Sequence, residues 1–409
     1  MSVSTHTANS SSCMTPVSPA SLREMICDET VDACSSMGGL DAIILTGSMA
    51  RDEASTTTDH QTTIVLGDAE FLLVFASTAR VPAANAVETF AKIVESRLLR
   101  RNVKCRICLS SVSNAFLEGI VPHIFGYELR HCGQVVWGDR NALTRVPPFE
   151  TSQIPFDDAV RLLCNRMVEL LELVAVSGLR SRVTKYATLK LYLDMATSFL
   201  IFAGAYRPTY RQRLKELEKV AATVQTGSLP FSLAAFVESI EYCTRLKLTP
   251  SDPLSGVFIS DAESEQLFVD GVRLAHLLWR WELQRLLQLD SNAPDEELLV
   301  RWAGSQPWMA RLRGWLRVVR DVNAATMRKN WKRWLKLARR KSPRHGVYAA
   351  GCQIFFRIPD LMQSRQIELY QDLSDLLPIS PEGNAELKWR SLAASIAQNY
   401  HQFVEFTRT

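Results

Sequence analysis

Asp68 and Glu70 are the two residues of this chain whose type and spacing best suit chemistry. They stand two positions apart, directly before an apolar run at 71–75 that indicates a short buried strand. Side chains two apart on a strand project from the same face, so the two carboxylates should lie close together. Carboxylates beside core residues are costly unless they coordinate a cation, and Mg²⁺ prefers such hard oxygen ligands. The pair therefore predicts a magnesium site.

A second chemical element, Gly47 followed by Ser48, ends an earlier apolar run at 42–45. Glycine lets the backbone approach a ligand closely, and a small hydroxyl beside free backbone amides can hold phosphate oxygens. Metal and phosphate binding together are what phosphoryl or nucleotidyl transfer requires. We therefore expect a nucleotide to bind between the glycine–serine bend and the acidic pair.

The order of these residues resembles the pattern of nucleotidyltransferases of the DNA polymerase beta type. That pattern is an apolar strand, Gly-Ser, a connecting segment, and Asp-x-Asp or Asp-x-Glu inside the next strand. Arg51 completes a Gly-Ser-x-x-Arg form, which is most similar to the aminoglycoside nucleotidyltransferase branch. A Glu-Leu-Arg helix and a Val-x-x-Gly strand at 128–138 extend the resemblance to about the first 145 residues.

The resemblance implies a magnesium-dependent nucleotidyltransferase that moves a nucleoside monophosphate from a nucleoside triphosphate to a hydroxyl acceptor. Asp68 and Glu70 would hold the metal and serve as the catalytic acids. Gly47 and Ser48 would bind the outer phosphates, and Arg51 would neutralise charge. The acceptor stays open, because an antibiotic, a protein side chain, a sugar and an RNA end all offer a hydroxyl.

Two features depart from the family pattern. The segment between Ser48 and Asp68 is longer than the usual spacing. The third carboxylate, expected on a strand at 102–109, is not visible; the face it would use carries Lys104, Arg106 and Cys108. A cation there would impair catalysis more than ground-state binding. The alternative is thus a catalytically impaired, nucleotidyltransferase-like binding or regulatory module, unless an acid from elsewhere, such as Glu118 or Glu128, completes the site.

Alternating helices and strands must position these residues. We expect helices at 21–34, with Ser21 as the cap, at 84–100 and at 121–130, and a further strand at 134–138. Prolines at 147, 148 and 155 mark a boundary, after which the pattern is helical throughout. The predicted class is α+β: a disordered tail (1–20), a small mixed-sheet nucleotidyltransferase domain (21–150), and a large all-helical domain (155–409).

The helical domain should supply cations to the nucleotide, because similar enzymes use such a domain to close the cleft. Its expected helices occupy 157–176, 182–203, 231–245, 264–289, 307–340, 348–377 and 382–406. By this analogy Lys185 and Lys190 are expected to bind the triphosphate, Arg182 is a further candidate, and Asp194 is a candidate base. Lys190 and Asp194 stand four apart on a helix, so a surface salt bridge is the competing interpretation.

A basic tract at 308–344 contains one acid, Asp321, and four tryptophans. Arginine with exposed aromatics would suit single-stranded RNA. However, the tryptophans fall into two stripes at helical spacing, which favours burial with a solvated basic face. Nucleic acid is therefore a less favoured partner. The stripes are Trp308, Leu312, Trp315, Val319 and Val322, and Met327, Trp331, Trp334 and Ala338.

Composition adds an expected location. The net charge of +4 creates no large field to attract nucleic acid or a membrane. Nine scattered cysteines form no disulfide framework and fit a reduced compartment. No stretch approaches the roughly 20 apolar residues that a membrane span needs. We expect a cytoplasmic protein without a membrane partner.

Overall fold

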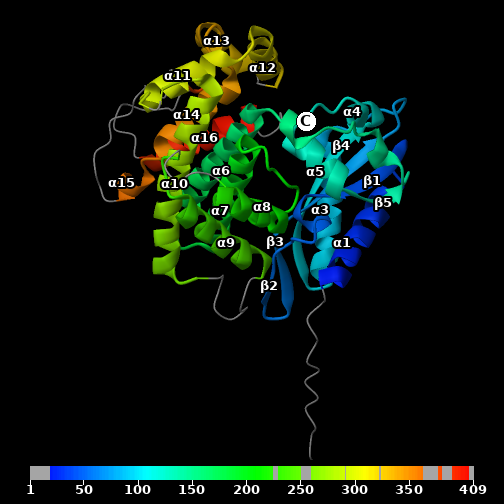
Figure 1. Ribbon diagram of the computed structural model, residues 1–409. Coiled ribbons are helices and arrows are strands. Elements are labelled where there is room, and N and C mark those ends of the chain that lie inside the picture. The colour runs from blue at the N-terminus through cyan, green and yellow to red at the C-terminus, as the bar shows by residue number, and fades with distance from the viewer. Residues whose placement is uncertain are drawn as a thin grey trace, which may run out of the picture. The chain divides into compact units, whose positions relative to one another are not determined.

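The computed structural model describes residues 19–223, 229–249, 259–290, 292–321, 324–362, 376–379 and 389–404. The chain divides into two compact units (Figure 1). The first, the α/β unit, comprises Met1–Gly119 and Cys132–Val146; the second, the helical unit, comprises Ile120–His131 and Pro147–Thr409. The expected tail lies outside the described residues as far as residue 18. The expected combination of a small sheet with many helices is confirmed.

The α/β unit is built on a five-stranded mixed sheet. Its central strand, β3, pairs in parallel with β4 along one edge. Along the other edge β3 pairs antiparallel with β2 and then with β1, and β1 pairs antiparallel with β5. The strands are β1 (Leu40–Thr46), β2 (Thr56–Asp59), β3 (Thr62–Phe75), β4 (Val103–Ser113) and β5 (Gln134–Gly138).

Helices α1 (Pro19–Cys34) and α3 (Ala84–Arg100) pack with one face of this sheet into a single core. Alternate strand residues, including Leu45, Phe71 and Leu73, point into that core and are buried. The period of two then directs Asp68 and Glu70 to the opposite face. Ser21 was expected to cap α1, but the helix begins at Pro19, so Ser21 lies within its first turn.

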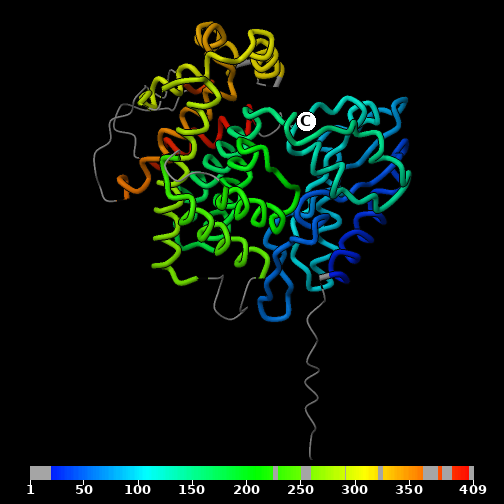
Figure 2. Tube along the Cα trace, in the orientation of Figure 1, coloured from blue at the N-terminus to red at the C-terminus, as the bar shows by residue number. Residues whose placement is uncertain are grey.

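The long segment between Ser48 and Asp68 contains a β-hairpin. Thr56–Asp59 pairs with the first residues of β3, and this hairpin is the narrow blue loop of Figure 2. Its two-residue turn begins at His60, which has a positive φ of 53°. β3 thus starts at Thr62, well before the apolar run that revealed it. The extra length is mostly an extension of the sheet beyond the acidic pair, which the short irregular segment 51–55 joins to the Gly47–Ala50 turn.

The helical unit is organised around α7 (Arg182–Phe202). Its residues are buried from Thr184 to Phe202 with the exception of Lys190, as expected for a helix surrounded by others. The helices of this unit are α5 (Ile124–Cys132), α6 (Phe156–Ser177), α7, α8 (Tyr210–Thr223), α9 (Leu233–Leu248), α10 (Asp261–Leu287), α11 (Asp295–Ser305), α12 (Trp308–Asp321), α13 (Ala324–Ala338), α14 (Pro343–Phe355), α15 (Ile358–Met362) and α16 (Trp389–Phe403).

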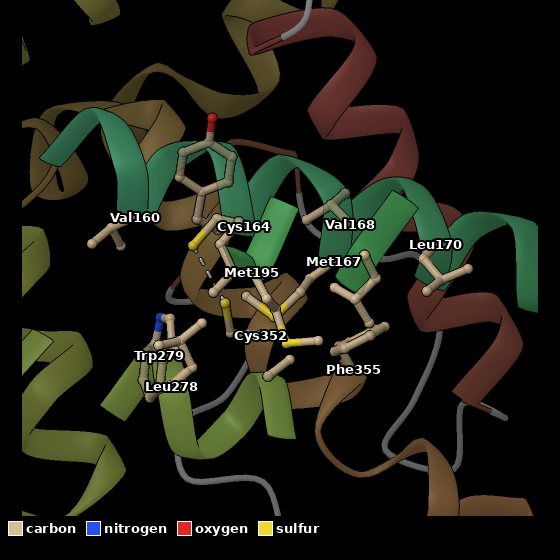
Figure 3. Packing of buried hydrophobic residues seen from close by; sticks show 14 of the residues in the cluster. Val160, Cys164, Met167, Val168, Leu170, Met195, Leu278, Trp279, Cys352 and Phe355 are labelled. Atoms are coloured by element: carbon tan, nitrogen blue, oxygen red, sulfur yellow. Dashed lines mark hydrogen bonds between the residues drawn. The ribbon is translucent and has the colours of Figure 1, made fainter. Parts of the chain in front are cut away.

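Helices α6, α7, α10 and α14 enclose the main core. Figure 3 shows Cys164 and Val168 of α6 facing Cys352 of α14, with the two sulfurs 3.8 Å apart. None of the cysteines that the structure describes forms a disulfide. Cys105 is buried and Cys108 is exposed, so these two cysteines lie on opposite faces of β4. Within the described ranges, no helix has the length and apolar character needed to cross a membrane.

Several helical segments differ from expectation. Helices α8 and α11 were not anticipated, because α8 is mostly polar and α11 is short. The stretch at 307–340 is two helices, α12 and α13, and the helix expected at 348–377 begins earlier and ends at Phe355. Parts of the segments expected at 348–377 and 382–406 lie outside the described residues. The Glu-Leu-Arg helix, α5, was expected in the first domain; almost all of it groups with the helical unit.

Candidate functional site

Asp68 and Glu70 lie on the face of β3 opposite to α1 and α3, ahead of Leu72 and Val74, which are buried on that same face. Ala69, between them, is fully buried in the core on the other side of the sheet. Asp68 is half-buried and Glu70 is exposed. The expectation that the two side chains share a face is therefore met by the geometry of the strand.

Gly47 lies directly against the Glu70 carboxylate. Thr46 is the register partner of Glu70 on β1, and its hydroxyl lies 3.4 Å from the Glu70 carbonyl oxygen. Gly47 follows with a φ of +68°, and a Cβ added there would stand 2.9 Å from Glu70 Cδ. A larger residue would be strained there and would displace the flexible Glu70 carboxylate. Gly47 and Glu70, which are 23 positions apart in the sequence, thus meet at this point.

Ser48 and Arg51 belong to the short turn that follows. Gly47–Ala50 forms a single helical turn, α2, and the Ser48 carbonyl accepts a hydrogen bond of 2.9 Å from the Glu53 amide. Arg51 Nε lies 3.6 Å from a carboxylate oxygen of Glu53, whose side chain is buried. Arg51 is therefore partly neutralised by an acid that sequence reasoning missed. Glu53 stands in a polar stretch with no periodicity, so no signal distinguished it.

The neighbouring strand presents a cation beside the acidic pair. Arg106 is the register partner of Asp68 on β4, and Cys108 is the partner of Glu70. Both are exposed, and side chains in register on adjacent strands share a face. This register agrees with the expectation that Arg106 and Cys108 lie on the face of β4 where a third acid would stand.

A third carboxylate does not come from elsewhere in the described part of the chain. Among those residues, no three His, Cys, Asp or Glu side chains gather as a metal site would require. Glu128 is engaged inside the helical unit, where it accepts hydrogen bonds from Arg213 and from the Tyr206 hydroxyl. Glu118 ends the short helix α4 (Asn114–Glu118).

The residues present fit one magnesium ion. Asp68 and Glu70 offer hard oxygen ligands, and phosphate and water can complete an octahedral shell. The space at Gly47, which a Cβ would fill, leaves the Glu70 carboxylate next to open backbone. A second ion bound near Asp68 would lie close to the guanidinium of Arg106 and would be repelled.

The residues expected to contact the triphosphate from the helical unit are engaged within it. Lys185 is only 6% exposed, and its ammonium donates to Asp261 at 2.8 Å and to the Ile259 carbonyl at 3.1 Å. Lys190 is half-buried, with its Nζ 5.4 Å from the centre of the Tyr186 ring. Arg182 is the first residue of α7 and is half-buried.

Asp194, the candidate base, lies in the interior. It is 6% exposed and accepts a hydrogen bond of 2.7 Å from Arg166 Nε, and Arg166 also pairs with Glu169. A surface salt bridge with Lys190 was the competing expectation. Asp194 instead belongs to a buried ion pair between α6 and α7, because α7 is covered on nearly all sides.

An ionic network that the sequence did not reveal closes the opposite end of β1. Arg145 donates to Asp41 at 2.8 Å and to Asp139 at 2.7 Å, and Asn114 donates to Asp41 at 2.8 Å. The Asn114 and Arg145 hydrogen bonds lower the pKa of Asp41. Asp41 and Asn114 are far from Arg145 in sequence, so the residue types alone do not predict this network. The network stabilises the fold of the α/β unit and is not part of the acidic site.

No protein-family model, curated protein or solved structure matches this chain. The functional interpretation therefore rests on the geometry of Gly47, Asp68, Glu70 and Arg106.

Proposed function

We propose that the α/β unit is a magnesium-dependent nucleotidyltransferase. Asp68 and Glu70 would hold Mg²⁺ together with a nucleoside triphosphate, and the outer phosphates would lie at the Gly47–Ser48 bend. The observation that carries this proposal is the contact geometry between Gly47 and the Glu70 carboxylate. It brings a glycine that permits close backbone approach to a metal-binding acid.

The chemistry of the proposed reaction is an attack by an acceptor hydroxyl on the α-phosphorus, with loss of pyrophosphate. When bound, Mg²⁺ would neutralise charge on the phosphates. The chain's own contribution would be positioning: Asp68 and Glu70 fix the side of the sheet on which the nucleotide lies, and Ser48 can hydrogen-bond phosphate oxygen. Arg51 would add charge compensation only in part, because Glu53 already faces it.

Arg106 favours a second candidate function. Its place beside Asp68 is where a third acid would anchor the ion that activates the attacking oxygen. The positive charge of Arg106 is compatible with a bound nucleotide but repels a second metal ion. The unit would then bind Mg²⁺–nucleotide without transferring the nucleoside monophosphate. In that case nucleotide binding would regulate the protein or a partner.

A labelling experiment separates the two functions. The full chain is incubated with Mg²⁺ and each of the four α-labelled nucleoside triphosphates, together with cell lysate as a source of acceptors. Transfer predicts pyrophosphate release and a labelled product above the level of an Asp68→Ala/Glu70→Ala variant. Nucleotide binding without either signal would assign the second function, and absence of binding would refute both.

A further inference from the structure

Helices α12 and α13, here called the basic hairpin, pack together on a small core of their own. Trp315 and Val318 of α12 meet Trp334 and Leu337 of α13, and Phe403 of α16 joins them. The indole N–H groups of Trp315 and Trp334 donate to the carbonyls of Lys341 (2.9 Å) and Pro378 (2.7 Å). These two tryptophans are therefore structural, as the helical spacing suggested.

Other members of the expected buried stripes are exposed, which corrects the sequence interpretation. Trp308 is 65% exposed and Trp331 is 47% exposed. At about 100° per residue, the apolar positions of α12 cover a wider arc than its packing against α13 and α14 can bury. The exposed large apolar side chains of the basic hairpin are Trp308, Met309, Leu312, Leu316, Val319, Trp331 and Leu335.

Basic residues border this apolar strip. On α12, Arg313, Arg317 and Arg320 are exposed along its side, and α13 adds further exposed cations. In the sequence from 308 to 344, Asp321 is the only acid, so the local charge is strongly positive although the whole chain carries +4. The exposed cations of α13 and the residues that follow it are Arg328, Lys329, Lys332, Lys336, Arg339 and Arg340.

We propose that the basic hairpin docks on the surface of a bilayer that contains anionic lipids. A helix with an apolar strip, flanking cations and tryptophan lies in the membrane interface, with its apolar side in the boundary between headgroups and acyl chains. Such docking requires no spanning helix. The positive field complements anionic headgroups, and each cation near the surface adds to the attraction. The expectation of no membrane partner is thereby revised.

The composition of the strip distinguishes lipid from nucleic acid. Five of its seven members are aliphatic or thioether side chains, Met309, Leu312, Leu316, Val319 and Leu335. Such side chains cannot stack on bases, and their contribution to binding comes from the removal of apolar surface from water. The tryptophans that remain exposed suit the interface of a bilayer, where an amphipathic ring has both an apolar and a polar neighbour.

Vesicle flotation with the full chain tests this proposal. One set of vesicles is phosphatidylcholine alone, and the other contains about 30% phosphatidylserine, which gives a negative surface potential. We expect binding to the anionic vesicles, weak binding to the neutral ones, and a loss of about fivefold in affinity for each basic residue replaced. Arg317→Gln/Lys332→Gln should therefore bind at least tenfold more weakly, and binding should fall as salt is raised.

The apolar strip is tested by Leu316→Gln/Leu335→Gln, which keeps all charges. Both side chains are more than half exposed (58% and 57%), so the fold should tolerate the change. We expect the affinity for anionic vesicles to fall by about tenfold or more, because two leucines no longer enter the apolar boundary. The matched control is Leu99→Gln/Val300→Gln, at sites 57% and 51% exposed outside the basic hairpin, which should bind as the wild type does.

Three results would overturn the proposal. The first is absence of binding to anionic vesicles. The second is vesicle binding that Leu316→Gln/Leu335→Gln leaves unchanged. If single-stranded RNA also binds the wild type and this variant equally, the surface would be assigned to nucleic acid. The third is self-association that the same variant abolishes while vesicle binding is absent, which would assign the strip to a second copy of the chain. No nucleotide is needed, so the outcome is independent of the proposed function.

Discussion

The Glu70 carboxylate lies where a side chain at position 47 would stand, since a Cβ on Gly47 would be 2.9 Å from Glu70 Cδ and 3.0 Å from Glu70 Oε1. The β1–β3 register produces this contact, because Thr46 and Glu70 are paired residues. The φ of +68° favours glycine at this position, and a side chain there would displace the flexible Glu70 carboxylate. The backbone effect and the displacement of Glu70 can be separated by experiment.

Gly47→Ala should weaken Mg²⁺–nucleotide binding, whereas the same substitution at a glycine with the same backbone angle should not. Gly204 also has a φ of +68°, but nothing lies within 4 Å of its missing Cβ. Both variants lose about 1–2 kcal/mol through the left-handed conformation. Gly47→Ala should in addition displace the exposed, flexible Glu70 carboxylate and weaken Mg²⁺–nucleotide binding. Urea denaturation measures the first effect and nucleotide titration the second; equal nucleotide affinities for the two variants would contradict the contact.

Arg106→Asp should strengthen the metal site. The substitution places a carboxylate on the face and in the register of Asp68, where the third acid of the resembled family would stand. We expect Mg²⁺ affinity to rise by about tenfold or more, since a repelling cation becomes a ligand. Lys104→Asp is the matched control, as it is exposed on the same face of β4 but paired with Ile64. If both variants bind Mg²⁺ equally, Arg106 is not beside the metal.

The sequence predicted the site where local periodicity carried the information. Alternation along β3 placed Asp68 and Glu70 on one face, and the same alternation on β4 placed Arg106 and Cys108 beside them. Local periodicity could not predict that Glu53 lies next to Arg51. It also could not predict that Arg145 lies between Asp41 and Asp139, because these contacts form between chain segments that meet only after folding. The fold class followed from the strand and helix periods, whereas α8 was missed because its buried side is small.

The basic hairpin shows a different limit. Helical spacing identified an apolar arc on α12, but it cannot say which part of the arc a neighbouring helix covers. Trp315 is buried there while Trp308 is exposed, although both satisfy the same periodicity. Exposure depends on the position of α13 and α14, which the sequence pattern of α12 does not contain.

Glu282 should make stability depend on pH. This carboxyl is fully buried in α10, and the neighbouring Ser198 hydroxyl offsets its burial only in part. Burial raises its pKa from 4.5 to about 8. Between these values the unfolded chain releases the proton that the folded protein keeps, so the free energy of unfolding falls as pH rises, by up to about 1.4 kcal/mol per pH unit.

Glu282→Gln should remove that contribution. Urea denaturation from pH 5 to 8 should give a smaller decline for this variant than for the wild type, and a more stable protein at pH 8. Glu238→Gln, at an exposed position on α9, is the control that should keep the wild-type slope. A Glu282→Gln slope identical to that of the wild type would show that this carboxyl does not hold its proton.

Arg213→Met should destabilise the helical unit. Arg213 is 4% exposed and donates to Glu128, to the Tyr206 hydroxyl and, at 2.9 Å, to the Thr197 hydroxyl. Removing the cation leaves the largely buried Glu128 charge with the Tyr206 hydroxyl but without its counter-ion, which costs about 3–5 kcal/mol. Lys92→Met breaks an exposed ion pair with Glu88 on α3 and should shift the denaturation midpoint far less. Denaturation midpoints that shift equally would refute the structural role of Arg213.

Equilibrium binding of nucleoside triphosphate to the full chain, with and without Mg²⁺, tests the central claim most directly. Asp68→Asn/Glu70→Gln keeps the shape of both side chains and removes both charges. The proposed site predicts binding that needs Mg²⁺ and that this variant weakens by at least about 100-fold, since two charged ligands of the ion are lost. Binding of equal strength without Mg²⁺, or to the variant, would contradict a metal–nucleotide site on β3.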